Sequence, residues 1–169
     1  AVPPIKIPID QAVLGYLAGL VDGEGNIAIV ELRPEACLAL KNSSYSLRVI
    51  ITNCDPRLIR WLCDQVGGGK VNPLVRKNIK WRQCFKWVLS GGNAEAFLRA
   101  IIHLLVIKRE QADLALAFRD ITMRTPRQGR EKLSPDVVRD RKVLYARMRF
   151  LNRRGVREEE EPRKVEAGY

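Results

Sequence analysis

Two acidic side chains stand close together in the segment Asp22-Gly23-Glu24-Gly25, directly after an apolar stretch that runs from Val13 to Val21. A stretch of this length without a polar face predicts a helix that is buried on all sides. The carboxylates would then lie at the carboxyl end of that helix, where the helix dipole disfavours negative charge. Two anions in such a place indicate a site that binds a cation, and the two glycines allow the backbone to turn there.

Small residues recur along one side of the predicted helix: Gly15, Ala18, Gly19 and Asp22 follow the spacing i, i+3, i+4 and i+7. Such a stripe allows a second helix to approach closely, and the sequence contains a single copy of this segment. We therefore expect two identical subunits to meet along these four residues about a two-fold axis. Each subunit would bring its own Glu24 to the centre, where two close carboxylates repel unless cations bridge them.

The chain is strongly basic, with 30 Lys and Arg against 19 Asp and Glu in 169 residues, a net charge of +11. This balance favours a polyanionic partner, of which nucleic acid is the commonest and an anionic membrane the alternative. The apolar runs are too short to span a bilayer, and no separate basic amphipathic helix is present, so we expect no membrane partner. The N-terminus lacks a signal-peptide pattern, which predicts an intracellular protein of the cytoplasm, nucleoid or an organelle matrix.

The cysteines and the single histidine do not have the spacing of a zinc site. Cys37, Cys54, Cys63 and Cys84 are expected to be buried, unpaired side chains in a reducing compartment, although four cysteines could also pair.

The hydrophobic periodicity predicts an α+β fold in one domain over residues 1–155, followed by a mobile charged tail at 156–169. The predicted order is a helix, two strands, a helix, two strands and then helices. The later strands are expected at Lys70–Arg76 and Lys80–Leu89, and the last helix from Ser134 to about Asn152. The strands would form an antiparallel, saddle-like sheet with the helices packed behind one face.

Positive side chains recur at one parity of the predicted strands with hardly an acid among them, whereas an ordinary surface interleaves both signs. Two-stranded ribbons can enter the major groove of DNA, where base edges are distinguishable. Arg153, Arg154 and Arg157 follow the last helix and would contact phosphates. The predicted DNA-binding residues are Asn26, Arg33, Ser46, Arg48, Asn72, Arg76, Lys80, Arg82, Lys86, Arg153, Arg154 and Arg157.

The segment LAGLVDGEG at Leu17 to Gly25 resembles the motif for which the LAGLIDADG homing endonucleases are named. It departs from that consensus at Val21 and Gly23, and Glu24 replaces one acid by another. The similarity in element order covers roughly residues 10 to 155. The resemblance implies a homodimer that binds a long pseudo-palindromic site in double-stranded DNA. It would hydrolyse both strands with Mg²⁺, for which Mn²⁺ or Ca²⁺ are plausible substitutes, and leave short 3′ overhangs.

The resemblance also implies roles for individual residues. Glu24 and the carbonyl of Gly23 would bind the metal, while Asp22 would be a structural acid at the helix end and the second choice for catalysis. The segment from Lys108 to Asp113 resembles the one that carries the family's pocket lysine, so Lys108 would organise water or stabilise phosphate charge. Asn53 would position solvent, although it is shorter than the usual glutamine, and Arg57 is a weaker candidate for a nearby basic residue.

Two other functions fit the same residues. An RNA-binding maturase that assists splicing of a group I intron would use the same basic sheet. A DNA-binding regulator without cleavage is the other alternative, but the presence of Glu24, Lys108 and Asn53 argues against it. We therefore expect a sequence-specific, metal-dependent endonuclease encoded by an intron.

Overall fold

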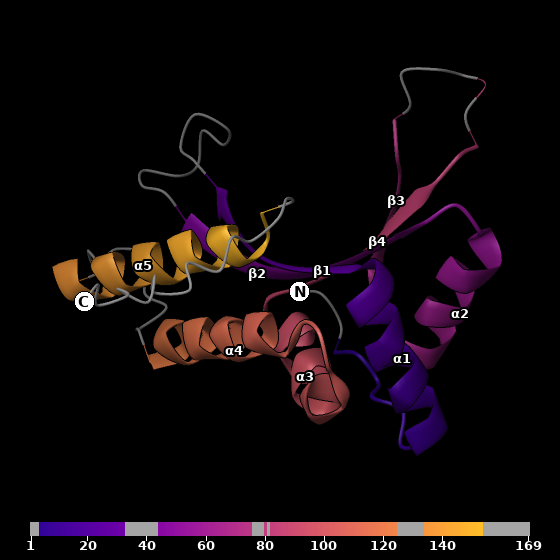
Figure 1. The fold of residues 1–169 in the computed structure, drawn as a ribbon, viewed down its shortest axis with the longest axis horizontal. Coiled ribbons are helices and arrows are strands. Elements are labelled where there is room, and N and C mark those ends of the chain that lie inside the picture. The colour runs from indigo at the N-terminus through magenta and orange to yellow at the C-terminus, as the bar shows by residue number, and fades with distance from the viewer. Residues whose placement is uncertain (1–3, 33–43, 76–79, 81, 125–133, 154–169) are drawn as a thin grey trace, which may run out of the picture.

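The computed structural model describes residues 4–32, 44–75, 80, 82–124 and 134–153 and shows an α+β fold (Figure 1). The elements in chain order are α1 (Gln11–Glu24), β1 (Gly25–Leu32), β2 (Ser44–Asn53), α2 (Pro56–Val66), β3 (Lys70–Pro73), β4 (Phe85–Ser90), α3 (Gly91–Ile101), the short 3₁₀ helix η2 (Ile102–Leu104), α4 (Arg109–Arg124) and α5 (Pro135–Leu151). The predicted fold class and order of elements are confirmed. None of the described helices combines the length and the apolar composition needed to cross a membrane.

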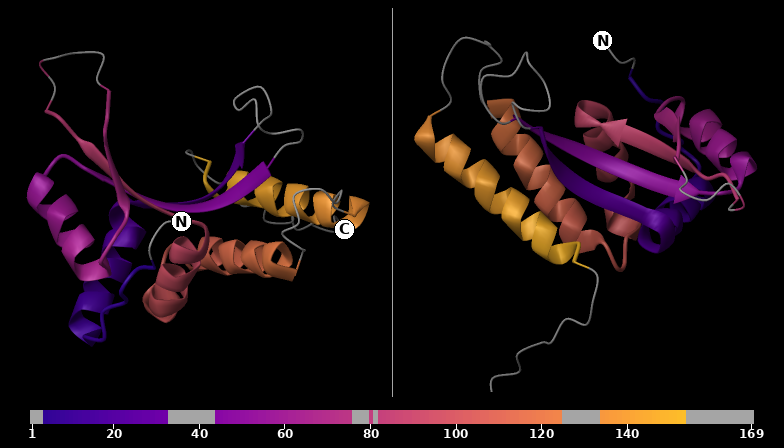
Figure 2. Two further views of the ribbon diagram at one scale, coloured as in Figure 1. Left: turned by 180° about the vertical axis from the view of Figure 1, so that it is seen from behind. Right: turned by 90° about the horizontal axis from the view of Figure 1, so that it is seen from above.

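The four strands form one antiparallel sheet in the order β1-β2-β4-β3. In its central register Ile27 lies opposite Val49, and Ile51 lies opposite Trp87. Because side chains alternate across a strand, these residues share one face of the sheet. Helices α1, α3 and α4 pack against that face, and α5 lies along the β1 edge beside α4, so the other face is uncovered (Figure 2).

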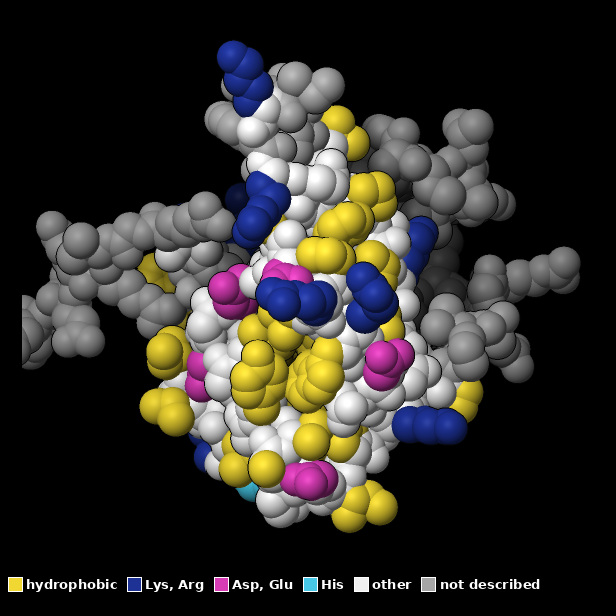
Figure 3. Space-filling model, turned by 90° about the vertical axis from the view of Figure 1, so that its right-hand side faces the viewer, with side chains coloured by type: hydrophobic (Ala, Val, Ile, Leu, Met, Phe, Trp, Pro, Cys, Tyr) yellow, Lys and Arg dark blue, Asp and Glu magenta, His cyan; other side chains and the backbone are white. Residues whose placement is uncertain are grey.

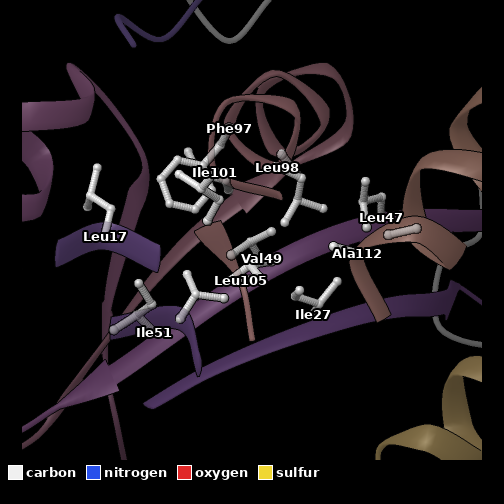
Figure 4. Packing of buried hydrophobic residues seen from close by; sticks show 14 of the residues in the cluster. Leu17, Ile27, Leu47, Val49, Ile51, Phe97, Leu98, Ile101, Leu105 and Ala112 are labelled. Carbon is white, nitrogen blue, oxygen red and sulfur yellow. The ribbon is translucent and has the colours of Figure 1, made fainter. Parts of the chain in front are cut away.

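The hydrophobic core lies between the covered face of the sheet and the helices (Figure 4). Helix α1 contributes Leu17, which is fully buried, and α3 contributes Phe97, whose ring packs edge to face against that of Trp87. Figure 4 shows side chains of α3 and α4 meeting the strands from the same side. Because the core occupies one face only, polar side chains of the strands collect on the other.

Capping residues fix where the helices begin. The Asp10 carboxylate accepts hydrogen bonds from the backbone N–H of Ala12 at 2.7 Å and of Val13 at 3.2 Å, which caps α1. Asp55 caps α2 in the same way and is followed by a proline at the first helical position, as the sequence predicted. Asp55 lies two residues after Asn53, one of the candidate site residues described below.

The fourth strand is shorter than predicted. It begins at Phe85 rather than Lys80, so the alternation expected from Lys80 through Arg82 does not apply. Both side chains are exposed, but they precede the strand. The prediction failed because the sequence pattern of alternation continues past the point where pairing with β2 ends, at Asn53 opposite Phe85.

The cysteine expectation is wrong for one pair, because a disulfide joins Cys54 to Cys84. These residues directly follow and precede the last pair of the β2–β4 ladder, which brings them together. Sequence spacing alone does not reveal that register. Cys63 is free and half-buried, and Cys37 lies outside the described residues.

Glycine at position 69 is required by its surroundings. Its φ is +108°, and a Cβ built there would lie 2.6 Å from Cε2 of the buried Trp87. The indole Nε1 also donates a hydrogen bond of 2.9 Å to the carbonyl of Gly68. We predict that Gly69→Ala lowers the free energy of unfolding by about 2–4 kcal/mol, through backbone strain and displacement of Trp87.

The matched control is Gly92→Ala on α3, where a Cβ would make only ordinary contact at 3.8 Å. Urea unfolding followed by tryptophan fluorescence would compare the two variants with the wild type. An equal, small effect of both substitutions would contradict the assigned role of Gly69.

Candidate functional site

Helix α1 runs directly into β1, because the helix ends at Glu24 and the strand begins at Gly25. The backbone N–H of Gly25 donates to the carbonyl of Val21, and a Cβ at Gly25 would lie 2.6 Å from that oxygen. Gly23, in contrast, has open space around it. In place of the expected glycine turn, the last turn of the helix is followed directly by the strand. Gly25 is the residue on which this change depends.

Asp22 connects the end of α1 to the segment that precedes α4. Its carboxylate accepts hydrogen bonds from the backbone N–H of Val106 at 2.8 Å and of Lys108 at 2.9 Å. The Lys108 ammonium in turn donates to the backbone carbonyl of Asp22. Burial raises the pKa of Asp22, but the backbone hydrogen bonds outweigh it, and the pKa lies below its ordinary value. Asp22 therefore has the structural position expected for it.

Lys108 is brought to the site by this connection. Its side chain is half-buried, and burial lowers the pKa of its ammonium, although the nearby negative charge of Asp22 opposes that shift. A cation held in this way can stabilise a phosphate group at the site.

The side chain of Glu24, at the end of α1, is hydrogen-bonded to that of Asn53, at the end of β2. The Asn53 amide Nδ2 donates to the Glu24 carboxylate at 3.2 Å, while its Oδ1 accepts from the backbone N–H of Asp55 at 2.8 Å. The amide is thereby oriented with its N–H groups toward Glu24. Glu24 itself is exposed, which leaves its carboxylate accessible to a ligand.

These residues surround a cavity of about 650 Å³ at the edge of the uncovered sheet face. The candidate catalytic and metal-binding residues Glu24, Gly23 and Lys108 line it, together with Asn26, Lys86 and Arg153 from the predicted DNA-binding set. Asn53 contacts Glu24 but is not part of the cavity wall. One cavity thus receives side chains from α1, β1, β2, β4, the start of α4 and the end of α5.

Sequence reasoning missed three polar residues in the cavity wall, Thr52, Gln111 and Asn152. Gln111 is almost fully buried and lies one helical turn after Lys108, a spacing that could have indicated it. Thr52 has the same strand parity as Arg48. Asn152 donates from Nδ2 to the carbonyl of Ile27 at 2.8 Å, a contact between distant segments that gives no sequence signal.

The register assigns part of the predicted DNA-binding set to the uncovered face. Asn26 lies opposite Ile50, and Asn72 opposite Lys86, on the face turned away from the core. Ser46 and Arg48 have the same parity, and Lys70, which was not predicted, joins them. The four predicted residues outside the described residues are Arg33, Arg76, Arg154 and Arg157.

The four residues of the predicted interface stripe do not all lie on the exposed side of α1 in the structure. Gly15 and Gly19 are exposed, with nothing within 4 Å of an added Cβ. Ala18 is only 1% exposed and packs inside its own subunit, so its inclusion in the stripe is corrected. Asp22 faces the 106–108 segment instead. The outward side of α1 therefore carries Ala12, Gly15, Tyr16 and Gly19.

Arg57 has a partner of its own rather than a place in the cavity. Its guanidinium pairs with Asp55 at 2.6 Å, and this hydrogen bond lowers the pKa of the Asp55 carboxyl to about 2. Arg57 instead lines an open surface pocket of about 470 Å³ with Tyr16, Leu58 and Trp61.

A divalent metal fits the donors at Glu24 only in part. Across the described portion of the chain, no group of three or more His, Cys, Asp and Glu is arranged to hold a metal ion. Mg²⁺, however, takes oxygen ligands and is commonly bound through one or two carboxylates, with water completing its shell. The Glu24 carboxylate and the Gly23 carbonyl, from two residues that line the cavity, suit that mode of binding.

No protein-family model matches the sequence, and a search of curated proteins finds no match. Solved structures do match the fold. The homing endonuclease I-CvuI in complex with the I-CreI target gives a TM-score of 0.67 at 21% identity, over 87% of this chain and 85% of that one. The chain has the fold of the LAGLIDADG homing endonucleases.

Two further structures with this fold extend the comparison. The archaeal intron-encoded homing endonuclease I-Vdi141I, complexed with DNA, gives a TM-score of 0.65 at 14% identity, over 88% of this chain and 89% of that one. The LAGLIDADG homing endonuclease I-SmaMI, bound to cleaved DNA, gives 0.61 at 18% identity. That match covers 83% of this chain but 45% of I-SmaMI. I-CvuI complexes were also obtained in the presence of Mg and of Ca.

The depressed pKa of Asp22 predicts a pH-dependent contribution to stability. Because the folded-state pKa lies below the unfolded one, this contribution is complete above about pH 4 and is lost as the pH falls through the folded-state value. Asp22→Asn should cost about 1–3 kcal/mol at pH 7, since a neutral amide accepts the two N–H groups less well.

Urea unfolding of wild type and Asp22→Asn at several values between pH 7 and pH 3 would measure this contribution. The difference between the two proteins should shrink as the pH falls. Asp64→Asn, at an exposed position on α2, is the matched control. A difference that stays constant with pH would contradict the assignment.

Proposed function

We propose that the protein is a site-specific DNA endonuclease that acts as a homodimer with divalent metal ions. The observation that carries this proposal is the convergence of Glu24 and Lys108 at one cavity beside the uncovered, basic face of the sheet, with Asn53 hydrogen-bonded to Glu24. Within the LAGLIDADG fold, an exposed acid, an oriented amide and a half-buried lysine are groups that hydrolysis of a phosphodiester can use.

Each residue has a distinct task in this proposal. Glu24 and the Gly23 carbonyl would hold Mg²⁺, with Mn²⁺ or Ca²⁺ as substitutes. Mg²⁺, when bound, supplies an activated water and neutralises phosphate charge. Asn53 fixes the Glu24 carboxylate, and Lys108 places positive charge beside the scissile phosphate. Arg153 and Lys86 at the cavity wall hold the DNA backbone on either side.

Two subunits are required because one chain supplies half of what a double-strand cut needs. The chain covers most of I-CvuI and I-Vdi141I but under half of I-SmaMI, so a second copy would take the place of the remainder. The outward glycines of α1 lie on the same helix as Glu24, and hydrophobic side chains gather at the centre of the face formed by α1 and α2 (Figure 3). A two-fold dimer through this face favours a long pseudo-palindromic target, and the resemblance to the LAGLIDADG family implies short 3′ overhangs.

Glu24→Gln tests the catalytic assignment. The amide keeps the size of the side chain but removes the charge that holds the metal, so cleavage in Mg²⁺ should fall by on the order of 100-fold or more. Binding to a site selected from randomised duplexes should remain. Gel analysis of cleavage and fluorescence anisotropy of binding would measure the two effects separately.

Glu110→Gln provides a matched control, because Glu110 is exposed and pairs with Arg147 at 2.7 Å away from the cavity wall. Full cleavage by Glu24→Gln would refute the assignment. A wild-type protein that binds a selected site but never cuts it would instead indicate a regulator.

Gly19→Leu tests the dimer. A leucine on the outward side of α1 has room in a single subunit but would separate two helices packed at this position. The variant should sediment as a species of 19.2 kDa, whereas the wild type should have twice that mass. Ala96→Leu, at an exposed position on α3, is the control and should not change the mass. An unchanged mass for Gly19→Leu would contradict the proposed interface.

A further inference from the structure

The uncovered face of the sheet contains an apolar patch that no helix covers. Ile50 on β2 and Val88 on β4 are directly opposed, and Ala28 on β1 lies diagonally beside Ile50. All three side chains are half-buried. Hereafter "the apolar patch" means Ala28, Ile50 and Val88. A sheet face that meets only water is normally polar, so aliphatic side chains at its centre indicate contact with a partner that also has apolar groups.

The surroundings of the patch are polar and positively charged. Arg48 lies opposite Ala28, and its buried Nε has no hydrogen-bond partner among the described residues. Lys70 lies opposite Val88, and Asn26 lies opposite Ile50. The face thus combines groups that hydrogen-bond to base edges and phosphates with a small area that can do neither.

DNA offers one apolar group that suits such an area. In the major groove, the 5-methyl group of thymine is the feature read by aliphatic side chains, while the other features are hydrogen-bond donors and acceptors. Ile50 also lines the cavity that contains Glu24 and Lys108. The patch therefore begins at the proposed cleavage site, and the bases that it contacts would be those nearest the cut.

We propose that the apolar patch reads thymine methyl groups in the major groove of base pairs next to the cleaved phosphates. This inference rests on the proposed function and adds a base preference to it. The polar residues around the patch fix the register on the backbone, and the patch then selects thymine over cytosine and over the unmethylated analogue uracil. A wrong base would leave the aliphatic side chains without a partner in the groove.

Replacing thymine by deoxyuridine isolates the methyl group, because the two bases have the same hydrogen-bonding edges. Each thymine of a duplex selected from a random library would be replaced in turn, and binding measured by anisotropy without divalent ions, so that the duplex stays intact. At one or two positions in each half-site, binding should weaken about fourfold, the factor expected for burial of one methyl-sized group.

The protein side of the test uses Val88→Thr, which introduces a hydroxyl at nearly unchanged shape, and Ile50→Thr, which introduces a hydroxyl and shortens the side chain by one carbon. In these variants the loss on changing thymine to uracil should disappear at the affected positions. Val71→Thr is the matched control, because Val71 lies opposite Trp87 on the other face of the sheet. Thermal unfolding of each variant, and binding to thymine-free parts of the site, would show that the fold is retained.

Three results would overturn the inference in different ways. Equal affinity for thymine and uracil at every position, in a protein that binds its selected site, would refute the methyl contact alone. Failure to enrich any duplex from the library would refute the proposed DNA-binding function and the methyl contact with it. A uracil effect that persists unchanged in the Ile50→Thr and Val88→Thr variants would assign the methyl contact to other residues.

Discussion

The Asp22 carboxylate is the constraint on which the candidate site depends. It binds the backbone N–H groups of Val106 and Lys108, which ties the end of α1 to the start of α4. Two segments far apart in the sequence are thereby joined at one point, and Lys108 is placed beside the cavity that contains Glu24. The burial cost of the carboxylate is met by these hydrogen bonds, as the lowered pKa indicates. Asp22 therefore contributes by positioning the residues of the site, and it has no chemical role of its own in the proposed reaction.

Helix α1 has a buried side that packs in the core and an exposed side that is available to a second subunit. Its inward side chains, including Leu17 and Val21, are fully buried against the sheet, so the helix cannot rotate without losing core packing. Its outward side has Gly15 and Gly19 with open space above them. The change to β1 without an intervening residue then fixes Glu24 at the boundary between the core and the uncovered face. One helix thus determines the core, the proposed interface and the position of the acid.

The sequence predicted the elements well because periodicity and capping are local properties. It also proposed Glu24, Asn53 and Lys108 as catalytic residues, and the structure brings them near one cavity. It failed where the answer depends on contacts between segments. Ala18 fits the small-residue spacing but is buried in the core. The sequence did not reveal this, because a helix that is apolar on all sides gives no indication of which side faces the core. The Cys54–Cys84 bond, the early end of the β2–β4 ladder and the place of Asn152 all depend on register and docking, which spacing does not encode.

The proposed activity requires a sheet with one face packed against helices and the other face uncovered. A face that packed against a second layer of helices would have to be apolar throughout. A face in contact with water alone would normally carry polar side chains at the positions of Ile50 and Val88. The observed mixture has positive and amide side chains around a small aliphatic area, and it continues without interruption into the cavity at Glu24. Recognition and hydrolysis would therefore share one surface, so a shift of β2 or β4 that altered the base contacts would also move Asn53 relative to Glu24. In the proposed function, specificity and cleavage would therefore depend on the same strands.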